Sequence, residues 1–284
     1  MNTKVKPDKY SAVWVSHSSM GDFLKCPRAY FLHNIYKDPN TNHKINITSP
    51  AMSLGVAIHE VLEGLIKYKA EDRRKQNLLK IFEIEWQKVS GRTGGFTSSD
   101  IEKEYKERGQ KMLTRVQNNF GPLINKAIRL QERENNMPPN FYLSEEDNII
   151  LCGKIDWLEY LPENDAIHVL DFKTGKNEEK EDSLQLPIYL LLLNNLQGRL
   201  VTRASYWYLE TDDFLTEKEL PPLATAEQSV LKVAREIKKA REDKNFLCPR
   251  GNTGCFSCQP YEKILNGQAE YVGVGGYGQD IYIV

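Results

Sequence analysis

The chain lacks the features that mark membrane proteins and secreted disulfide-rich domains. Its longest apolar run, Leu186 to Leu193 with one tyrosine inside, is far too short to span a bilayer. The first ten residues are polar and contain no apolar signal-peptide core. The five cysteines are odd in number and follow no disulfide framework, which favours free thiols or metal ligation. We therefore expect a cytoplasmic protein with no membrane partner.

The chain also lacks an excess of positive charge and a nucleotide-binding loop. Its net charge is −1, so any nucleic-acid site must be a local basic patch on a balanced surface. No Gly-x-x-x-x-Gly-Lys-Ser/Thr loop is present, so the chain brings no ATP-driven motor of its own. At 284 residues it can form one large domain or one domain with a substantial insertion.

The hydrophobic pattern predicts an α/β protein in which helices precede and follow a group of strands. Residues 14–36 and 51–69 are expected to be helical, with Pro27 bending or dividing the first segment. Residues 71–138 are expected to form a charged helical region, interrupted by a mobile loop at Gly91–Gly95 and ending in a connector at 135–140. The remaining expected elements are strands at 142–144, 149–158, 167–172 and 204–209, helices at 183–196 and 225–241, and a hairpin within 267–284.

Two of the expected strands each carry an aspartate. If their hairpin turn is centred between Glu163 and Asn164, the numbers of paired residues sum to 327, which is the sum of 156 and 171. Asp156 and Asp171 would then stand opposite each other with Cβ atoms about 5 Å apart. Lys173 lies two residues beyond Asp171, so its side chain leaves the same face.

This arrangement predicts a divalent-metal site. Two carboxylates at this distance repel each other unless a cation lies between them, and oxygen ligands suit Mg²⁺ or Mn²⁺. Such an ion can polarise a phosphate and lower the pKa of a bound water, and Lys173 could orient that water or stabilise the developing charge. The alternative interpretation is a solvated surface hairpin with ordinary ion pairs.

Three further polar residues accompany the hairpin. Gln185 and Tyr189 are four apart on a strongly apolar helix, so they share one face and need polar partners. They could border the metal site or form a hydrogen-bonded pair in the core. His59 lies one helical turn after Gly55, and a lone histidine on a helix is more often structural than a metal ligand.

Taken in order, these residues resemble the RecB-like branch of the PD-(D/E)XK nuclease superfamily. This branch includes the nuclease domains of RecB and AddB and the CRISPR-associated RecB-like exonucleases. The resemblance covers most of the chain. It rests on a serine-rich start followed by Cys-Pro-x-x-Tyr, a Gly-x-x-x-His motif and three later motifs, which here are Ser16 to Phe31, Gly55 to His59, Gly153 to Asp156, Asp171 to Lys173, and Gln185 with Tyr189.

The resemblance implies a fold and a role for each site residue. It implies a single restriction-endonuclease-like domain over residues 1–284, with a mixed sheet flanked by helices and residues 71–138 as a helical insertion. His59, Asp156 and Asp171, together with the main-chain carbonyl of Phe172, would bind the Mg²⁺ or Mn²⁺ ion. Lys173 would be the catalytic lysine. Gln185 and Tyr189 would support the site and the DNA backbone.

The resemblance also implies a 4Fe-4S cluster, held by one cysteine before the nuclease core and three after it. Cys26 matches the first of these, and Cys255 with Cys258 matches the later Cys-x-x-Cys. The usual last cysteine is absent from residues 259–268, and Cys248 lies upstream instead. We expect residues 245–266 to meet Cys26, with the four thiolates binding a cluster or zinc; free thiols are the alternative. Cys152 is expected to be a small buried apolar residue.

The resemblance favours a DNA exonuclease that acts on single-stranded ends in repair, recombination or CRISPR-type DNA processing. The alternatives are a non-catalytic DNA-end-binding subunit of a helicase or recombination complex, and a zinc-stapled interaction module without a DNA role. Tyr206, Trp207 and Tyr208 could stack on bases or belong to the core. Candidate phosphate contacts are Arg28, Lys154, Lys176 and the basic segment Lys232, Arg235, Lys238, Lys239 and Arg241, although a solvated helix face is the preferred interpretation of that segment.

Overall fold

A four-stranded mixed sheet forms the core of the computed structural model, which describes residues 8–130 and 137–284. Its strands lie in the order β5 (Trp157–Leu161), β6 (Ala166–Lys173), β7 (Val201–Tyr208) and β8 (Thr216–Lys218). Strands β6 and β7 are parallel and are connected through α7 (Gln185–Leu196), because a parallel pair needs a long crossover. The two outer pairs are antiparallel.

The predicted hairpin register is confirmed. Trp157 pairs with Leu170 and Leu161 pairs with Ala166, so the paired numbers sum to 327 throughout the β5–β6 ladder. Asp156 lies one residue before β5, at the point where the ladder opens. The turn closes through Asp165, which has a left-handed φ of 48°.

A second sheet adjoins this hairpin through a bend in the chain. It contains β1 (Val13–Val15), β4 (Ile149–Cys152) and β3 (Asn140–Ser144). The chain leaves β4, turns over residues 153–156 and enters β5, so the expected single strand at 149–158 is two strands. A Cβ atom on Gly153 would lie 3.0 Å from Leu192 Cδ1, so glycine lets α7 pack closely over the bend.

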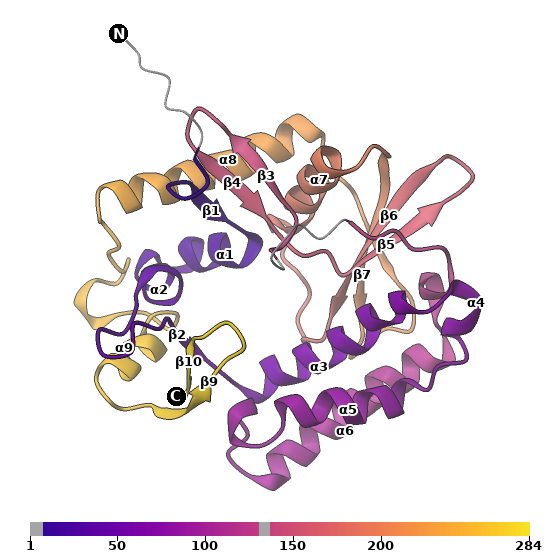
Figure 1. The fold of residues 1–284 in the computed structure, drawn as a ribbon, viewed down its shortest axis with the longest axis horizontal. Helices are drawn as coiled ribbons and strands as arrows, with labels where there is room; N and C mark the ends of the chain where they lie inside the picture. The colour runs from indigo at the N-terminus through magenta and orange to yellow at the C-terminus, as the bar shows by residue number, and fades with distance from the viewer. Residues whose placement is uncertain (1–7, 131–136) are drawn as a thin grey trace.

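Two apolar cores lie on opposite faces of the four-stranded sheet. Ile167 and Val169 of β6 pack on one face with α7 and α8 (Leu223–Glu242). Leu170 and Phe172 alternate with them and pack on the other face with α3 (Pro50–Gly64), α5 (Leu78–Val89) and α6 (Ser99–Asn118). Figure 1 shows α3, α5 and α6 side by side below the sheet. The described part of the chain therefore has the expected α/β layers.

The region expected to be a helical insertion contains α4 (Ala70–Arg73), α5 and α6, followed by a 3-10 turn over Gly121–Ile124. Beyond that turn the chain is extended, and Ala127 forms a bridge with Glu159 of β5. Residues 131–136, which include part of the expected connector, lie outside the described residues. The Gly91–Gly95 segment, expected as a mobile loop, interrupts the helices as predicted. It forms a 3-10 turn packed against the start of α3, where the Gly94 carbonyl accepts a hydrogen bond from Ser53 Oγ at 2.8 Å.

The first expected helix is divided more finely than the sequence pattern indicates. Residues 13–15 form β1. Ser16 is the N-cap of α1 (His17–Lys25), and its side chain accepts a hydrogen bond from the Ser19 N–H. Pro27 divides the segment as predicted, because α2 (Pro27–Tyr30) starts there, and a π-helical turn continues over Phe31–Ile35.

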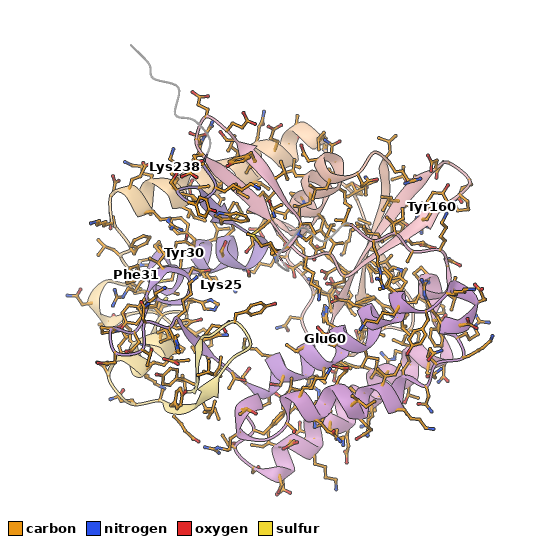
Figure 2. All side chains as sticks on the ribbon, in the orientation of Figure 1. Lys25, Tyr30, Phe31, Glu60, Tyr160 and Lys238 are labelled. Carbon is orange, nitrogen blue, oxygen red and sulfur yellow. The ribbon has the colours of Figure 1, made fainter. Side chains whose placement is uncertain are left out.

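The end of the chain returns to this early segment. Strand β10 (Asp280–Ile283) forms the expected hairpin with β9 (Glu270–Val274) and also pairs in parallel with β2 (Ile45–Ile47). Helix α9 (Gln259–Leu265) lies beside this small sheet (Figure 1). Figure 2 shows a gap bordered by α1, α3 and the β9–β10 hairpin that the drawn side chains leave open, with Lys25 and Glu60 labelled on opposite sides. Within the described residues, we find no helix with the length and hydrophobicity needed to cross a bilayer.

Close packing of α6 on its neighbours gives a stability prediction. A Cβ atom on Gly109 would lie 2.5 Å from Phe82 Cζ and 3.0 Å from Leu54 Cδ1, so Gly109→Ala should destabilise the protein by about 1–3 kcal/mol. Gly21 of α1 is the control, because it has open space around it and Gly21→Ala should stabilise the helix by about 0.5–1 kcal/mol. Urea unfolding of both variants measures the difference. Equal effects of the two substitutions would contradict the packing argument.

Candidate metal and catalytic site

The alternation of β6 directs its two charged side chains toward α7. Asp171 and Lys173 share the parity of Ile167 and Val169, which pack on the α7 face. Helix α7 is buried on nearly every side, yet it directs Gln185 and Tyr189 at that face. The crossover that makes β6 and β7 parallel therefore also covers the acidic end of β6.

Asp171 is only 2% exposed and is surrounded by donors. Its Oδ1 accepts hydrogen bonds from Tyr189 Oη at 2.8 Å and Gln185 Nε2 at 2.5 Å. Its Oδ2 lies 2.9 Å from Lys173 Nζ. Burial, with a further contribution from the charge of Asp156, raises the pKa of Asp171 to about 6, although Lys173 opposes this shift. The two aspartates are therefore close enough to repel each other, as the hairpin register implies.

Lys173 lies at the junction of β6 and the loop over residues 174–184. Its ammonium group pairs with Asp171, donates to Gln185 Oε1 and lies 3.0 Å from Glu179 Oε2. It also lies 4.8 Å from the centre of the Tyr206 ring. Burial alone would lower the pKa of Lys173, but Asp171 and Glu179 outweigh it, so the pKa is raised and the lysine stays charged.

Asp156 reaches from the bend before β5 toward α3. Its Oδ2 accepts a hydrogen bond from the Phe172 N–H at 2.8 Å, and its Oδ1 lies 3.4 Å from His59 Nδ1. The main chain of Phe172 therefore lies between the Asp156 carboxylate and the neighbouring Asp171. Gly55 allows this approach, because a Cβ atom there would lie 3.3 Å from Thr174 Oγ1, just beyond Lys173.

Glu63 completes this group and was missed in the sequence analysis. Its Oε1 lies 3.2 Å from His59 Nδ1, and its Oε2 lies 2.6 Å from Lys154 Nζ. Burial alone would lower the pKa of His59, but its hydrogen bonds to the Asp156 and Glu63 carboxylates raise it to about 10. The signal that could have found Glu63 is its i+4 spacing from His59 on one helix.

The donor atoms of His59, Glu63 and Asp156 lie within 4.8 Å of one another. One imidazole nitrogen and carboxylate oxygens form a donor set that suits Mg²⁺ or Mn²⁺, so these residues fit the expected ion. Asp171 is adjacent and in this conformation turns toward α7. The structure thus places the expected residues in two neighbouring groups, His59 with Asp156 and Asp171 with Lys173, Gln185 and Tyr189. The hydrogen bond from the Phe172 N–H to Asp156 connects them.

The four expected cysteines form a separate group. Cys26 lies between α1 and α2, and Cys248, Cys255 and Cys258 lie between α8 and α9, yet all four Sγ atoms lie within 4.8 Å of one another. All four are free thiols, and Cys26 and Cys258 are buried. Four thiolates at such distances suit a structural metal centre. Cys152 lies apart from them; it is half-buried rather than buried as expected, and its thiol donates to the Val15 carbonyl.

The expected DNA-contacting residues differ in their surroundings. Tyr206, Trp207 and Tyr208 are buried in the core. Lys154 and Arg28 pair with Glu63 and Glu262. The basic residues of α8 include three that pair with acidic neighbours, which agrees with a solvated face: Arg235 with Asp147, Lys238 with Glu242 and Lys239 with Asp243.

Comparison with known proteins identifies the family. The model of the PD-(D/E)XK nuclease superfamily matches residues 14–263, so the chain belongs to that superfamily. A proposed exonuclease from Eubacterium rectale is among the solved structures that match; it is 11% identical, with 91% of this chain and 94% of that chain covered and a TM-score of 0.47. No curated protein matches the chain.

The position of Glu63 predicts a measurable effect on metal binding. Glu63→Gln removes one negative charge that faces His59 and should weaken Mn²⁺ binding by about tenfold or more. Isothermal titration calorimetry on the purified protein measures this affinity. Glu104→Gln, on the exposed side of α6, is the matched control and should leave the affinity unchanged. Unaltered Mn²⁺ binding in the Glu63 variant would remove this residue from the site.

Proposed function

We propose that this protein is a divalent-metal-dependent DNA nuclease that hydrolyses phosphodiester bonds. The observation that carries the proposal is the position of two groups at one end of β6: Asp171 pairs with Lys173, and Asp156, which accepts a hydrogen bond from the Phe172 N–H, pairs with His59. The same strand holds a buried carboxylate and a charged amine two residues apart, and the neighbouring bend adds a second carboxylate. Membership of the PD-(D/E)XK superfamily supports this assignment.

The metal ligands we propose are His59, Asp156, Asp171 and the main-chain carbonyl of Phe172. Mg²⁺ or Mn²⁺ bound there would polarise the scissile phosphate and make a bound water more acidic. The protein supplies the rigid positions of the donors: α3 holds His59, the bend before β5 holds Asp156, and the Phe172 N–H fixes the direction of the Asp156 carboxylate.

Lys173 is the proposed catalytic lysine. Its raised pKa keeps it as a cation, which can hold the attacking water by a hydrogen bond and stabilise negative charge on the phosphate oxygens. Gln185 and Tyr189 are proposed to position the reacting groups, because both contact Asp171 and Gln185 also accepts a hydrogen bond from Lys173. Glu179 pairs with the same ammonium group, so Lys173 must contact both Glu179 and the reacting water or phosphate when substrate binds.

We propose DNA with single-stranded ends as the substrate and exonucleolytic cleavage as the mode. Figure 2 shows Lys25 of α1 and Glu60 of α3 on opposite sides of the open centre of the view; both are exposed, and Glu60 is the neighbour of His59 on α3. Lys154, Lys176 and Arg28 are the proposed phosphate contacts. The resemblance to RecB-like enzymes supports a cytoplasmic role in repair, recombination or CRISPR-type processing, with a helicase or recombination protein as a possible partner.

We further propose that Cys26, Cys248, Cys255 and Cys258 hold a structural metal centre. The resemblance to RecB-like nucleases implies a 4Fe-4S cluster, and zinc is the other occupant that four thiolates suit.

The catalytic proposal predicts which substitutions abolish cleavage. Lys173→Ala and Asp171→Ala should each lower the Mn²⁺-dependent cleavage rate by about a hundredfold or more, because each removes a charge that acts on the transition state. Lys180→Ala, in the exposed part of the same loop, is the matched control and should cleave DNA at nearly the parental rate. Circular dichroism and urea unfolding check that the variants fold.

The assay uses end-labelled single- and double-stranded DNA with Mg²⁺ or Mn²⁺. A Lys173→Ala variant as fast as the parent would contradict the role assigned to Lys173. DNA binding without hydrolysis by the parent protein under either ion would instead favour the non-catalytic end-binding subunit.

The exonuclease proposal gives a separate prediction. Linear single-stranded DNA should be degraded to short products, whereas a covalently closed single-stranded circle of the same sequence should remain intact, because it offers no end. Denaturing gel electrophoresis of both substrates measures the result. Linearisation of the circle at a comparable rate would show endonucleolytic cleavage instead, while leaving the metal-dependent chemistry in place.

A further inference from the structure

The separation of the four cysteine sulfurs discriminates between the two kinds of metal centre. All four Sγ atoms lie within 4.8 Å of one another, and Cys255 Sγ lies 3.9 Å from Cys258 Sγ. A single tetrahedral zinc ion with Zn–S bonds of about 2.3 Å holds its sulfurs about 3.8 Å apart. In a 4Fe-4S cluster each thiolate binds a different iron, so the cube of iron and sulfide separates the cysteine sulfurs to about 6 Å.

The surroundings of the sulfurs also leave little room for a cluster. Cys26 and Cys258 pack together with Ala29 in a small core that the other two cysteines join. A Cβ atom on Gly254 would lie 3.2 Å from Cys258 Sγ, so the main chain already approaches this sulfur closely. The expanded group needed for a cube would have to push these segments apart. The cysteines therefore do not fit the cluster that the resemblance implies.

The spacing of the cysteines along the chain also differs from the pattern that the resemblance implies for a 4Fe-4S cluster. The three late cysteines follow as Cys-x₆-Cys-x₂-Cys, with no later cysteine in α9 or its approach. Two of them form tight turns in which main-chain N–H groups point at sulfur. Arg250 N–H donates to Cys248 Sγ at 3.4 Å, and Cys255 N–H donates to Cys258 Sγ at 3.2 Å. Such bonds stabilise thiolate charge close to a small cation.

We propose that Cys26, Cys248, Cys255 and Cys258 bind a single Zn²⁺ ion in tetrahedral coordination. Four protein ligands leave no open position, so this site is structural and does not act on substrate. The zinc site joins the junction of α1 and α2 to the segment before α9. In Figure 1 these segments lie on the opposite side of the view from β5 and β6. Zinc binding at this site can be measured without nuclease activity, from the metal content and the absorption spectra of the protein.

The test uses the full chain, produced in medium with equal zinc and iron, purified without oxygen and dialysed against a mild chelator. Elemental analysis should find about one tightly bound zinc per chain, iron far below one, and no acid-labile sulfide. Replacement of zinc by Co²⁺ should give the intense visible bands of tetrahedral cobalt together with thiolate-to-cobalt charge transfer. Titration with a mercurial thiol reagent should release the zinc as the thiols react.

Matched variants locate the ion. Cys248→Ser, at the partly exposed edge of the group, should lose the tightly bound zinc, and so should Cys26→Ser. Cys152→Ser removes a cysteine outside the group and should retain it. His59→Ala alters the other metal site and should also retain it, which separates the two sites. If Cys26→Ser does not fold, the Cys248 variant and the mercurial titration of the parent protein still decide the question.

Two results would overturn the proposal. One is a brown protein with about four iron and four sulfide per chain whose visible absorption is lost in Cys255→Ser. The other is a folded, metal-free protein whose four cysteines remain freely titratable or form disulfides. Zinc that is retained in Cys248→Ser but lost in His59→Ala would also contradict the proposal, because the ion would then be bound at the His59 site and not by the cysteines.

Discussion

Compensation of the Asp171 charge is the constraint on which the rest of the site depends. An isolated carboxylate at 2% exposure would cost several kilocalories per mole, so its donors must be held in place by the fold. Tyr189 and Gln185 supply them from α7, and Lys173 supplies a cation from the same strand. Because the rest of α7 is apolar as far as Leu193, these contacts also fix its rotation over the sheet. The packing of α7 on the sheet and the geometry of the site therefore depend on the same contacts.

The bend between β4 and β5 brings the second half of the site to the first. At this bend the chain changes partners, from β1 and β3 to β6, and Asp156 lies in the opening between the two sheets. There its carboxylate can meet both the Phe172 N–H and His59 of α3, which belongs to the layer on the other face of the sheet. A straight strand would have kept Asp156 on one face only. The site therefore forms where the layers are discontinuous.

The sequence allowed the parts of this site that depend on local pattern to be predicted. The β5–β6 register followed from a short turn and alternating apolar residues, and it is confirmed. The burial of Gln185 and Tyr189 followed from a helix that is apolar on nearly all sides, whereas the parallel pairing of β6 with β7 was not predicted. Strands β1 and β2 were missed because each has three residues and pairs with a segment more than 130 residues away. No local periodicity can reveal such strands.

The acidic partners Glu63 and Glu179 were missed for a related reason. On α3, Glu63 is one of two glutamates, and its role depends on the approach of Asp156 and Lys154 from the bend before β5 as well as on its spacing from His59. Glu179 lies in an irregular loop whose course depends on contacts with α1, where Ser183 Oγ lies 3.5 Å from His17 Nε2. Sequence spacing predicts faces of regular elements, but it carries no information about which loop folds over an active lysine.

Helix α1 offers a physical route between the cysteine group and the nuclease residues. It begins at His17, beside the loop that holds Glu179, and ends at Cys26. The β2–β10 pairing independently joins the same early and late segments, so the fold of the two ends does not rest on thiolates alone. One short helix therefore connects the cysteine group with the loop beside Lys173.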